Sequence, residues 1–212
     1  MLQVNQLIGF GAAAAGAAEV QKVWNSADIG AGMALSNGDL DAAGSTCGTW
    51  GMVRAVSAVS GGKYYWELEG ISASNVAYVI CGIASSGASL TNYVGNSANG
   101  GAFQSGNALN AAHVYEGITS NSGSTITYGA TDVLMFAIDV AGDKAWFGQN
   151  GTWFNSGDPA AGTGALWTGL GGGTWYPAAS CYTTGDKVRL RSLASEFSYS
   201  IPTGFSSYGS AP

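Results

Sequence analysis

The chain has 212 residues, enough for one sizeable domain or two small ones with a buried core. With 46% hydrophobic and 11% aromatic residues it can bury enough apolar surface to fold, which excludes a disordered polar chain. Seven Lys and Arg against thirteen Asp and Glu give a net charge of -6, which disfavours nucleic acid as a partner.

Small side chains dominate the composition. Charged residues make up 9% of the chain, whereas 34 Gly, 33 Ala and 24 Ser together fill 91 of the 212 positions. Such a composition suits a surface that is inert, tightly packed or repeated in an assembly. It is compatible with a trimer, a ring or an isolated spike, and we expect a homo-oligomer or a larger assembly. No run approaches the ~20 apolar residues of a membrane span, so we expect no membrane partner.

The first 20 residues are expected to form an arm before the folded domain. Their run GFGAAAAGAAEV has the small residues of a signal-peptide cleavage region, but residues 1–8 carry no Lys or Arg, and Asn5 and Gln6 interrupt the apolar part. We therefore expect the segment to stay on the chain. An Ala/Gly arm has too little apolar surface to order itself, so we expect a partner to hold it. The predicted organisation is an arm at 1–20, one domain at 21–205 and a C-terminal tail at 206–212.

The clearest predicted strand runs from Lys63 to Ile71, where an apolar set alternates with a more polar one. The side chains expected to point inward are Tyr64, Trp66 and Leu68, and those expected to point outward are Lys63, Tyr65, Glu67 and Glu69. This pattern predicts a strand with one buried face.

Two further runs, Val76–Ala84 and Val133–Val140, are apolar almost without a break, the exception being Asp139. Their length and β-branched content predict strands that are covered on both faces.

Turn signals separate the predicted strands. Asn150-Gly151, between WFGQ and TWFN, is the dipeptide that best satisfies the positive φ angles of a two-residue hairpin turn. Lys187–Leu190 alternates again, with Val188 and Leu190 expected to face inward. Short strands with little helical periodicity between them indicate an all-β fold, an antiparallel β-sandwich.

Three Gly-, Ser- and Asn-rich stretches, 85–101, 102–123 and 156–173, do not fit a strand pattern. Loops of this length are usually functional or docked on a partner. Aromatic rings in such loops offer a large, rigid contact area at little entropic cost. The alternative is that the rings fold back over the open ends of the sandwich. The predicted ligand-binding residues are Tyr93, Phe103, Tyr115 and Trp167, together with the single histidine, His113, next to Val114 and Tyr115.

Taken in order, the motifs resemble those of the SPRY family, a concanavalin-like β-sandwich module. The matching segments, between about residues 24 and 205, are LSNGDLDAAGST, WGMVRAVSAVSGGKYYWELEG, VAYVICGIASSGASLTNYVG, YGATDVLMFAIDVAGDKAWFGQNGTWF, WYPAAS and FSYSIPTGF. Where the family usually has Asn-Phe-Gly after the penultimate strand, this chain has Leu193-Ala194-Ser195. The resemblance implies that partners are held by loops along one rim, which the segments 85–123 and 156–173 would supply.

The start VNQLIGFG and the hairpin WFGQNGTWFNSGDPAAGTG are similar to SPRY-like proteins encoded by tailed bacteriophages. This implies a non-enzymatic virion accessory protein, a capsid decoration, tail or fibre component, located on the virion. Residues 1–20 would dock it on other virion proteins, and its loops would face a host surface glycan, a host protein or neighbouring subunits. The alternatives are a carbohydrate-binding, lectin-like module that uses the loop aromatics and, less favoured, a glycan hydrolase.

Two charged patterns have alternative interpretations. Glu67 and Glu69 share one strand face, as the two carboxylates of a glycosidase could, although Glu67 is more simply the glutamate of the family's core motif. Lys187, Arg189 and Arg191 form a row that could grip an anionic glycan, or could pair across the sheet with the two glutamates.

We expect neither a metal nor a cofactor. Asp139 and Asp143 suggest a calcium turn, but two carboxylates are too few for a calcium shell, and a hairpin turn explains them. Cys47, Cys81 and Cys181 fit neither a disulfide framework nor a zinc spacing, so we expect free thiols.

Overall fold

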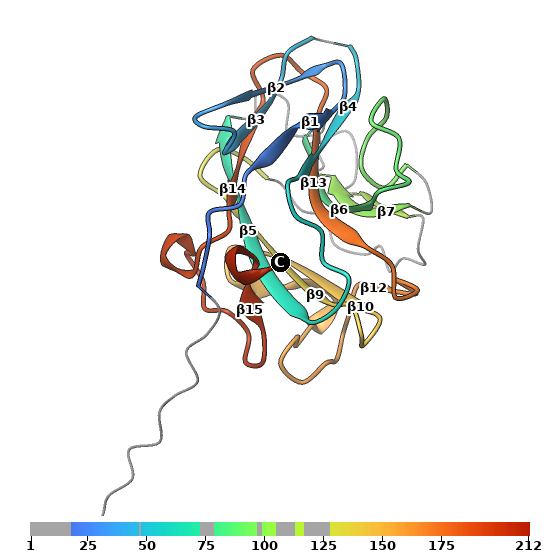
Figure 1. Ribbon diagram of the computed structural model, residues 1–212, viewed down its shortest axis with the longest axis vertical. Coiled ribbons are helices and arrows are strands. Elements are labelled where there is room, and N and C mark those ends of the chain that lie inside the picture. Colours follow the sequence, from blue (N-terminus) through green and yellow to red (C-terminus); the bar gives the residue numbers. More distant parts are fainter. Residues whose placement is uncertain (1–17, 47, 73–78, 97–98, 105–112, 117–127) are drawn as a thin grey trace, which may run out of the picture.

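The computed structural model describes residues 18–46, 48–72, 79–96, 99–104, 113–116 and 128–212 (Figure 1). At 103–104 and 113–116 it describes the backbone alone. Within these ranges the chain consists of strands, turns and short 3-10 segments, and no α-helix occurs there.

The strands of the described chain, in order, are β1 (Trp24–Ile29), β2 (Met33–Ser36), β3 (Asp41–Gly44), β4 (Gly51–Ala55), β5 (Lys63–Ser72), β6 (Val79–Ser85), β7 (Gly100–Gln104), β8 (His113–Glu116), β9 (Val133–Asp139), β10 (Lys144–Gln149), β11 (Thr152–Trp153), β12 (Trp167–Thr168), β13 (Trp175–Cys181), β14 (Lys187–Arg191) and β15 (Ser206–Ser207). The short 3-10 segments are η2 (Phe154–Ser156), η3 (Ala194–Glu196) and η4 (Tyr208–Ser210).

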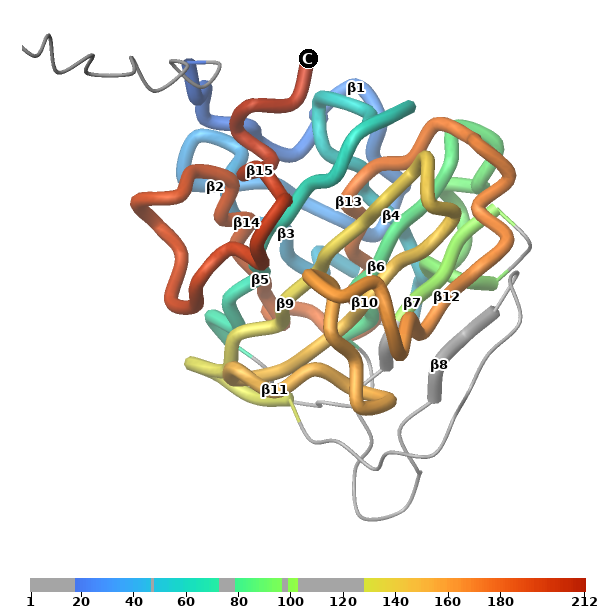
Figure 2. The backbone as a smooth tube through the Cα atoms, turned by 90° about the horizontal axis from the view of Figure 1, so that it is seen from below, coloured from blue at the N-terminus to red at the C-terminus, as the bar shows by residue number. Residues whose placement is uncertain are grey.

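These strands form two sheets packed face to face (Figures 1 and 2). One sheet has six strands in the order β1-β4-β13-β6-β7-β8. The other follows β11-β10-β9-β5-β14-β3-β2, with β12 beside β10 and β15 beside β5. The neighbours along both paths are antiparallel, and β15 joins β5 in parallel. The predicted antiparallel β-sandwich is confirmed.

The central strands are covered on both faces. In β6, Val79, Cys81 and Ile83 join the core between the sheets, whereas Ile80 and Ala84 belong to a second cluster on the outer face. β9 divides in the same way between the inner core and a third cluster, on the outer face of the nine-stranded sheet. This double coverage confirms the prediction for Val133–Val140 and for residues 79–84 of the other run, whose residues 76–78 lie outside the described residues.

β5 differs from its prediction. Trp66 faces the inner core as expected, but Tyr65 and Glu67 on the other side are also fully buried, with 0% of their surface exposed. The segment 192–205, which we call the C-terminal strap, covers this side, and its Phe197 ring meets the Tyr65 ring edge-on at 4.9 Å. The expectation of a solvent-facing side was wrong because a segment from far along the chain packs over it.

The last seven residues belong to the sandwich, so the boundary expected at residue 205 lies too early. Ser206–Ser207 form β15 against β5. Tyr208 is fully buried, with its ring centroid 5.9 Å from that of Trp66, and its hydroxyl donates to the carbonyl of Ser57. The residues expected to form a tail therefore supply an aromatic ring to the core.

Of the predicted arm, residues 18–20 are described and residues 1–17 lie outside the described residues. The Val20 amide donates to the Gly209 carbonyl at 2.9 Å. The Glu19 carboxylate accepts from the Ala194 amide at 3.1 Å and from the Ser207 hydroxyl. The chain therefore enters the sandwich along its own C-terminal segment.

The hairpin turn is confirmed at Asn150-Gly151, where φ is 49° and 83°. The Asn150 side chain also accepts from the Val133 amide at 2.9 Å, which ties the turn to the start of β9.

Cys81 and Cys181 are buried free thiols, as expected, and Cys47 lies outside the described residues. Burial raises the pKa of the Cys181 thiol to about 12. In the part of the chain that the structure describes, no helix is long and apolar enough to cross a membrane.

Three buried tyrosines predict a loss of stability at alkaline pH. Burial raises the pKa of Tyr65, Tyr128 and Tyr208, and the Glu67 carboxylate beside Tyr65 adds to its shift. Each hydroxyl therefore holds its proton more tightly in the folded chain than in the unfolded chain, where the pKa is about 10. The stability is fully present below that pH. Above it, the free energy of unfolding should fall by up to about 1.4 kcal/mol per pH unit for each tyrosine.

An absorbance titration of the tyrosines, combined with urea unfolding between about pH 8 and 11, measures this effect. Of the ten tyrosines, these three should ionise only as the chain unfolds. Ionisation of all ten near pH 10 in a chain that stays folded would contradict the prediction.

Candidate functional site

Of the predicted ligand-binding residues whose side chains are described, Tyr93 lies in a surface loop and Trp167 does not. Trp167 has 0% of its surface exposed. It lies on β12, where pairing with Ala145 of β10 turns the ring into the core, against Gly101 of the opposite sheet. The prediction of a surface ring at Trp167 was wrong because the segment 156–173 returns to pair with the sheet.

The side chains of Phe103, His113 and Tyr115 lie outside the described residues. Their backbone belongs to β7 and β8, which pair with each other at the edge of the six-stranded sheet, so the described residues of the segment 102–123 form strands, which the sequence did not predict. Ligand binding by these three residues stays a prediction.

Tyr93 belongs to the loop that follows β6, residues 86–96, which we call the rim loop (Figure 1). The loop packs on the outer face of the six-stranded sheet, where Ala88 and Val94 join the outer cluster around Met52. The rim loop therefore forms a layer that packs on the outer face of the six-stranded sheet.

Arg54 of β4 is the main polar anchor of the rim loop. Its Nη1 donates to the carbonyls of Ser85 and Ala88, at 2.7 and 3.1 Å. Its Nε and Nη2 donate to the two carboxylate oxygens of Asp28, at 2.6 and 2.7 Å. One buried guanidinium thus joins β1, the end of β6 and the loop.

Two further contacts hold the middle of the loop. The Val94 amide donates to the Ser180 hydroxyl at 3.1 Å, and the Met52 amide donates to the Leu90 carbonyl at 3.0 Å. Gly30 is required beside this second contact, because a Cβ there would overlap the Leu90 carbonyl.

Three half-buried rings gather where the loop meets the sheet. The centroids of the Tyr93 and Tyr182 rings lie 5.1 and 4.8 Å from the centroid of the Trp50 ring, both in tilted contacts. We call the rim loop together with Trp50 and Tyr182 the rim surface. Half-buried rings that pack on one another present a fixed apolar area to a partner.

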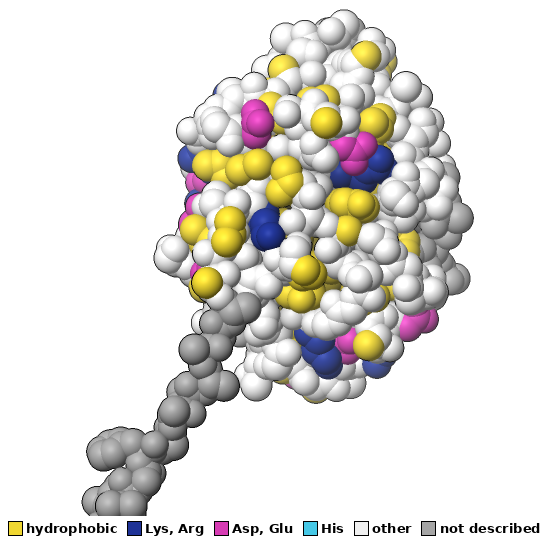
Figure 3. Space-filling model, in the orientation of Figure 1, with side chains coloured by type: hydrophobic (Ala, Val, Ile, Leu, Met, Phe, Trp, Pro, Cys, Tyr) yellow, Lys and Arg dark blue, Asp and Glu magenta, His cyan; other side chains and the backbone are white. Residues whose placement is uncertain are grey.

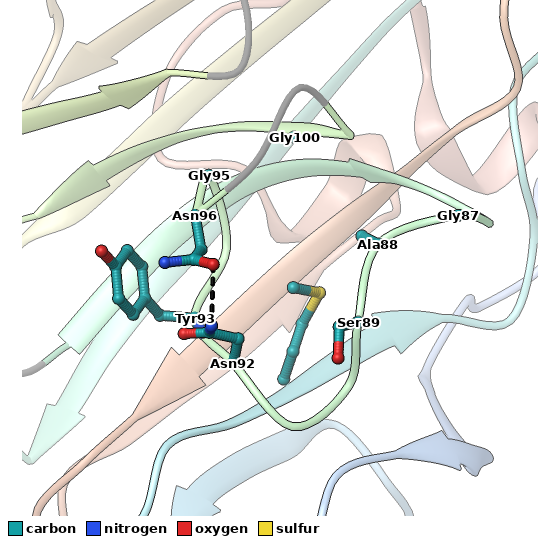
Figure 4. Close-up of a pocket in the computed structure, with 9 residues that line it drawn as sticks. Gly87, Ala88, Ser89, Asn92, Tyr93, Gly95, Asn96 and Gly100 are labelled. Atoms are coloured by element: carbon teal, nitrogen blue, oxygen red, sulfur yellow. Dashed lines mark hydrogen bonds between the residues drawn. The ribbon is translucent and has the colours of Figure 1, made fainter.

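A hollow of about 120 Å³ is lined mainly by residues of the rim loop, Tyr93 among them (Figure 4). Its lining residues include Met52, Ala88, Ser89, Asn92 and Asn96. The side-chain amide of Asn92 donates to the side-chain oxygen of Asn96 at 2.7 Å. This volume is below that of most small-molecule sites, and it suits a single side chain or another small group of a larger partner.

The rim surface carries no charged residue of its own. The loop reads SGASLTNYVGN, and Arg54 beneath it is paired with Asp28. Figure 3 shows that Lys, Arg, Asp and Glu side chains are sparse on the face seen there. The arrangement therefore suits recognition by shape, aromatic contact and amide hydrogen bonds.

Glu67 is part of the fold and offers no access for a substrate. Its carboxylate accepts from the amides of Ser198 and Tyr199, at 2.8 and 2.9 Å, and Arg191 lies 3.5 Å away. The C-terminal strap thus seals the acid that the glycan hydrolase alternative would need beside Glu69. The simpler interpretation of Glu67, as the glutamate of a structural motif, agrees with these contacts.

The two arginines of the cation row are paired across the sheet. Arg189 donates to Asp41 at 2.7 and 3.1 Å, and Arg191 lies 2.9 Å from Glu69. The structure therefore favours the paired alternative for these two arginines over a grip on an anionic glycan.

Asp139 and Asp143 stabilise turns. Asp139 accepts from the Gly142 amide at 2.8 Å, and Asp143 accepts from the amides of Gly169 and Gly171, at 3.0 and 2.8 Å. Among the described residues no group of three or more His, Cys, Asp and Glu is placed to hold a metal ion.

Sequence reasoning missed Trp50, Tyr182 and Arg54. The two rings stand next to β4 and β13 and not inside a long loop, so the search for aromatics in long loops passed over them. Arg54 did carry a signal, because it is the one charged residue of the otherwise uncharged strand GMVRA.

No family model matches the sequence, and no curated protein matches it. Solved structures do match the fold. The SPRY domain of human HERC1 superposes with a TM-score of 0.60 at 18% identity, covering 79% of this chain and 96% of that domain. A human SPRY domain superposes with a TM-score of 0.56 at 15% identity, covering 77% of this chain and 96% of that domain. The PSpry domain of TRIM65 superposes with a TM-score of 0.57 at 12% identity, covering 81% of this chain and 92% of that domain. The fold is therefore that of a SPRY-like, concanavalin-like β-sandwich.

Proposed function

We propose that this protein is a non-enzymatic binding module and that it binds its partner through the rim surface. The observation that carries the proposal is the ordered, uncharged layer of rings and amides, held from beneath by Arg54. The likeness to SPRY domains supports it, because in that family loops along one rim hold partners. A fixed surface also loses little conformational entropy when a partner binds.

We propose further that the module is an accessory protein of a tailed-phage virion. The resemblance of its hairpin and its first residues to phage proteins supports this, as does its small-residue composition. In this proposal residues 1–20 dock it on a capsid, tail or fibre subunit. The last residues of this stretch, Glu19 and Val20, contact the C-terminal segment of the same chain.

Two variants test the two surfaces separately. A chain that lacks residues 1–17 keeps the contacts of Glu19 and Val20, so it should fold but be absent from purified particles. Tyr93→Ala should still join the particle, while adsorption to host cells falls roughly tenfold or more, because the variant loses a central ring of the binding surface. Mass spectrometry of purified particles and an adsorption assay measure the two effects.

Tyr199→Ala is the matched control, since Tyr199 is also half-buried but lies on the strap over the other sheet. It should leave adsorption unchanged. Because the rim surface is uncharged, adsorption should also change less than about twofold between roughly 0.05 and 0.5 M NaCl. Normal incorporation without residues 1–17 would refute the docking arm, and normal adsorption of Tyr93→Ala would refute the rim surface.

A lectin-like module is the second candidate. Its support is the proximity of half-buried rings to the Asn92 and Asn96 amides, a combination that suits a neutral sugar. A glycan array probed with the purified chain separates the candidates. Sugar binding that Tyr93→Ala abolishes favours the lectin, whereas no binding at high micromolar concentration favours a protein partner.

A further inference from the structure

A buried arginine lies directly beneath the rim loop. On β4, Val53 and Ala55 face the inner core, while Arg54 faces outward beside Met52. Only 7% of its side chain is exposed, and the Tyr176 ring centroid lies 5.6 Å from the guanidinium carbon. A cation at this depth destabilises the fold unless it is paired and hydrogen-bonded.

The pairing of Arg54 uses the shape of its guanidinium as well as its charge. The Asp28 carboxylate accepts two hydrogen bonds from one edge of the planar group, and the carbonyls of Ser85 and Ala88 accept from Nη1. The Ala88 amide in turn donates to the Ser85 carbonyl at 3.2 Å, which closes the first turn of the loop. A lysine would keep a positive charge here but could not make all of these bonds.

We infer that Arg54 and Asp28 form a positioning pair that sets the conformation of the rim loop. Asp28 orients the guanidinium, and the guanidinium holds the carbonyls of Ser85, at the end of β6, and of Ala88, in the first turn of the loop. Ala88 also lines the hollow, so the pair determines the shape of the rim surface without touching a partner. The inference rests on the proposed function only in naming that surface as the place where a partner binds.

Hydrogen exchange of the full-length chain, without any ligand, tests the inference. Arg54→Met removes every donor at similar volume, and Arg54→Lys keeps the charge beside Asp28. The amides of Ala88 and Val94 should exchange at least about tenfold faster in Arg54→Met, while those of β9 on the other sheet stay unchanged. Arg54→Lys should give an intermediate increase. Asp28→Asn should also raise the exchange rates of the Ala88 and Val94 amides, because the guanidinium is then free to turn.

The inference is overturned if the amides of Ala88 and Val94 exchange in Arg54→Met at the wild-type rate. It is also overturned if exchange of the β9 amides speeds up by the same factor as exchange of the loop amides. Should Arg54→Met fail to fold, Arg54→Lys decides by the same comparison. Equal exchange rates of the loop amides in Arg54→Lys and the wild type would show that a positive charge alone holds the loop. That result also overturns the role given to the guanidinium shape.

The failure of this inference can be told apart from the failure of the proposed function. If Arg54→Lys loosens the loop but neither it nor Tyr93→Ala changes adsorption, the positioning pair stands and the binding surface is elsewhere. If Tyr93→Ala lowers adsorption while the Arg54 variants leave loop exchange unchanged, the binding surface stands and the positioning pair does not.

Discussion

A chain that ends at residue 205 is expected to lose most of its stability. The truncation removes β15 and the fully buried Tyr208, whose ring packs on Trp66. Loss of a buried aromatic side chain alone costs about 3–5 kcal/mol, a large part of the roughly 5–15 kcal/mol that keeps a typical domain folded. Urea unfolding followed by tryptophan fluorescence measures the change.

Tyr208→Phe is the control for the truncation. It keeps the ring in the core and removes only the hydroxyl that donates to Ser57, so it should cost about 1–2 kcal/mol. If the truncated chain unfolds within about 1 kcal/mol of the full-length chain, residues 206–212 are a tail after all and the packing of Tyr208 contributes little.

Glu67→Ala is expected to destabilise the protein by about 3–5 kcal/mol, because it removes one partner of a buried ionic and hydrogen-bonded cluster. The amides of Ser198 and Tyr199 would lose their acceptor, and Arg191 would lose its fully buried counter-ion. The C-terminal strap should therefore loosen first. Urea unfolding measures the change in the free energy of unfolding, and hydrogen exchange of the Ser198 and Tyr199 amides measures the local opening of the strap.

Glu69→Ala is the matched control, since Glu69 lies two residues away on the same strand and pairs with the same arginine. Its side chain is 22% exposed, and the cost should be below about 1 kcal/mol. Similar costs for the two substitutions would mean that burial of Glu67 under the strap does not matter.

The candidate site was only partly predictable. Tyr93 was predicted as an aromatic ring in a polar, glycine-rich loop, and in the structure it is a half-buried ring of a surface loop. Its partners Trp50 and Tyr182 come from positions about 40 and 90 residues away, next to strands whose neighbours are set by sheet order rather than by local sequence. Trp167 carried the same local signal as Tyr93, yet its segment pairs with β10 and buries it.

The sequence by itself determined the strands β5, β9 and β14, the Asn150-Gly151 hairpin and the sandwich class, but not β7, β8 and β12, which lie in stretches without a strand pattern. The features that it determined follow from period-2 alternation and from the positive φ angles that few residues adopt, both of which are local properties. Only the tertiary structure decided which strand faces are covered. Alternation shows that Tyr65 and Glu67 share a side of β5, but the strap that buries this side lies about 130 residues further along the chain. The same long-range packing takes Tyr208 into the core and brings Arg54 beneath the rim loop, because burial depends on which distant segments meet.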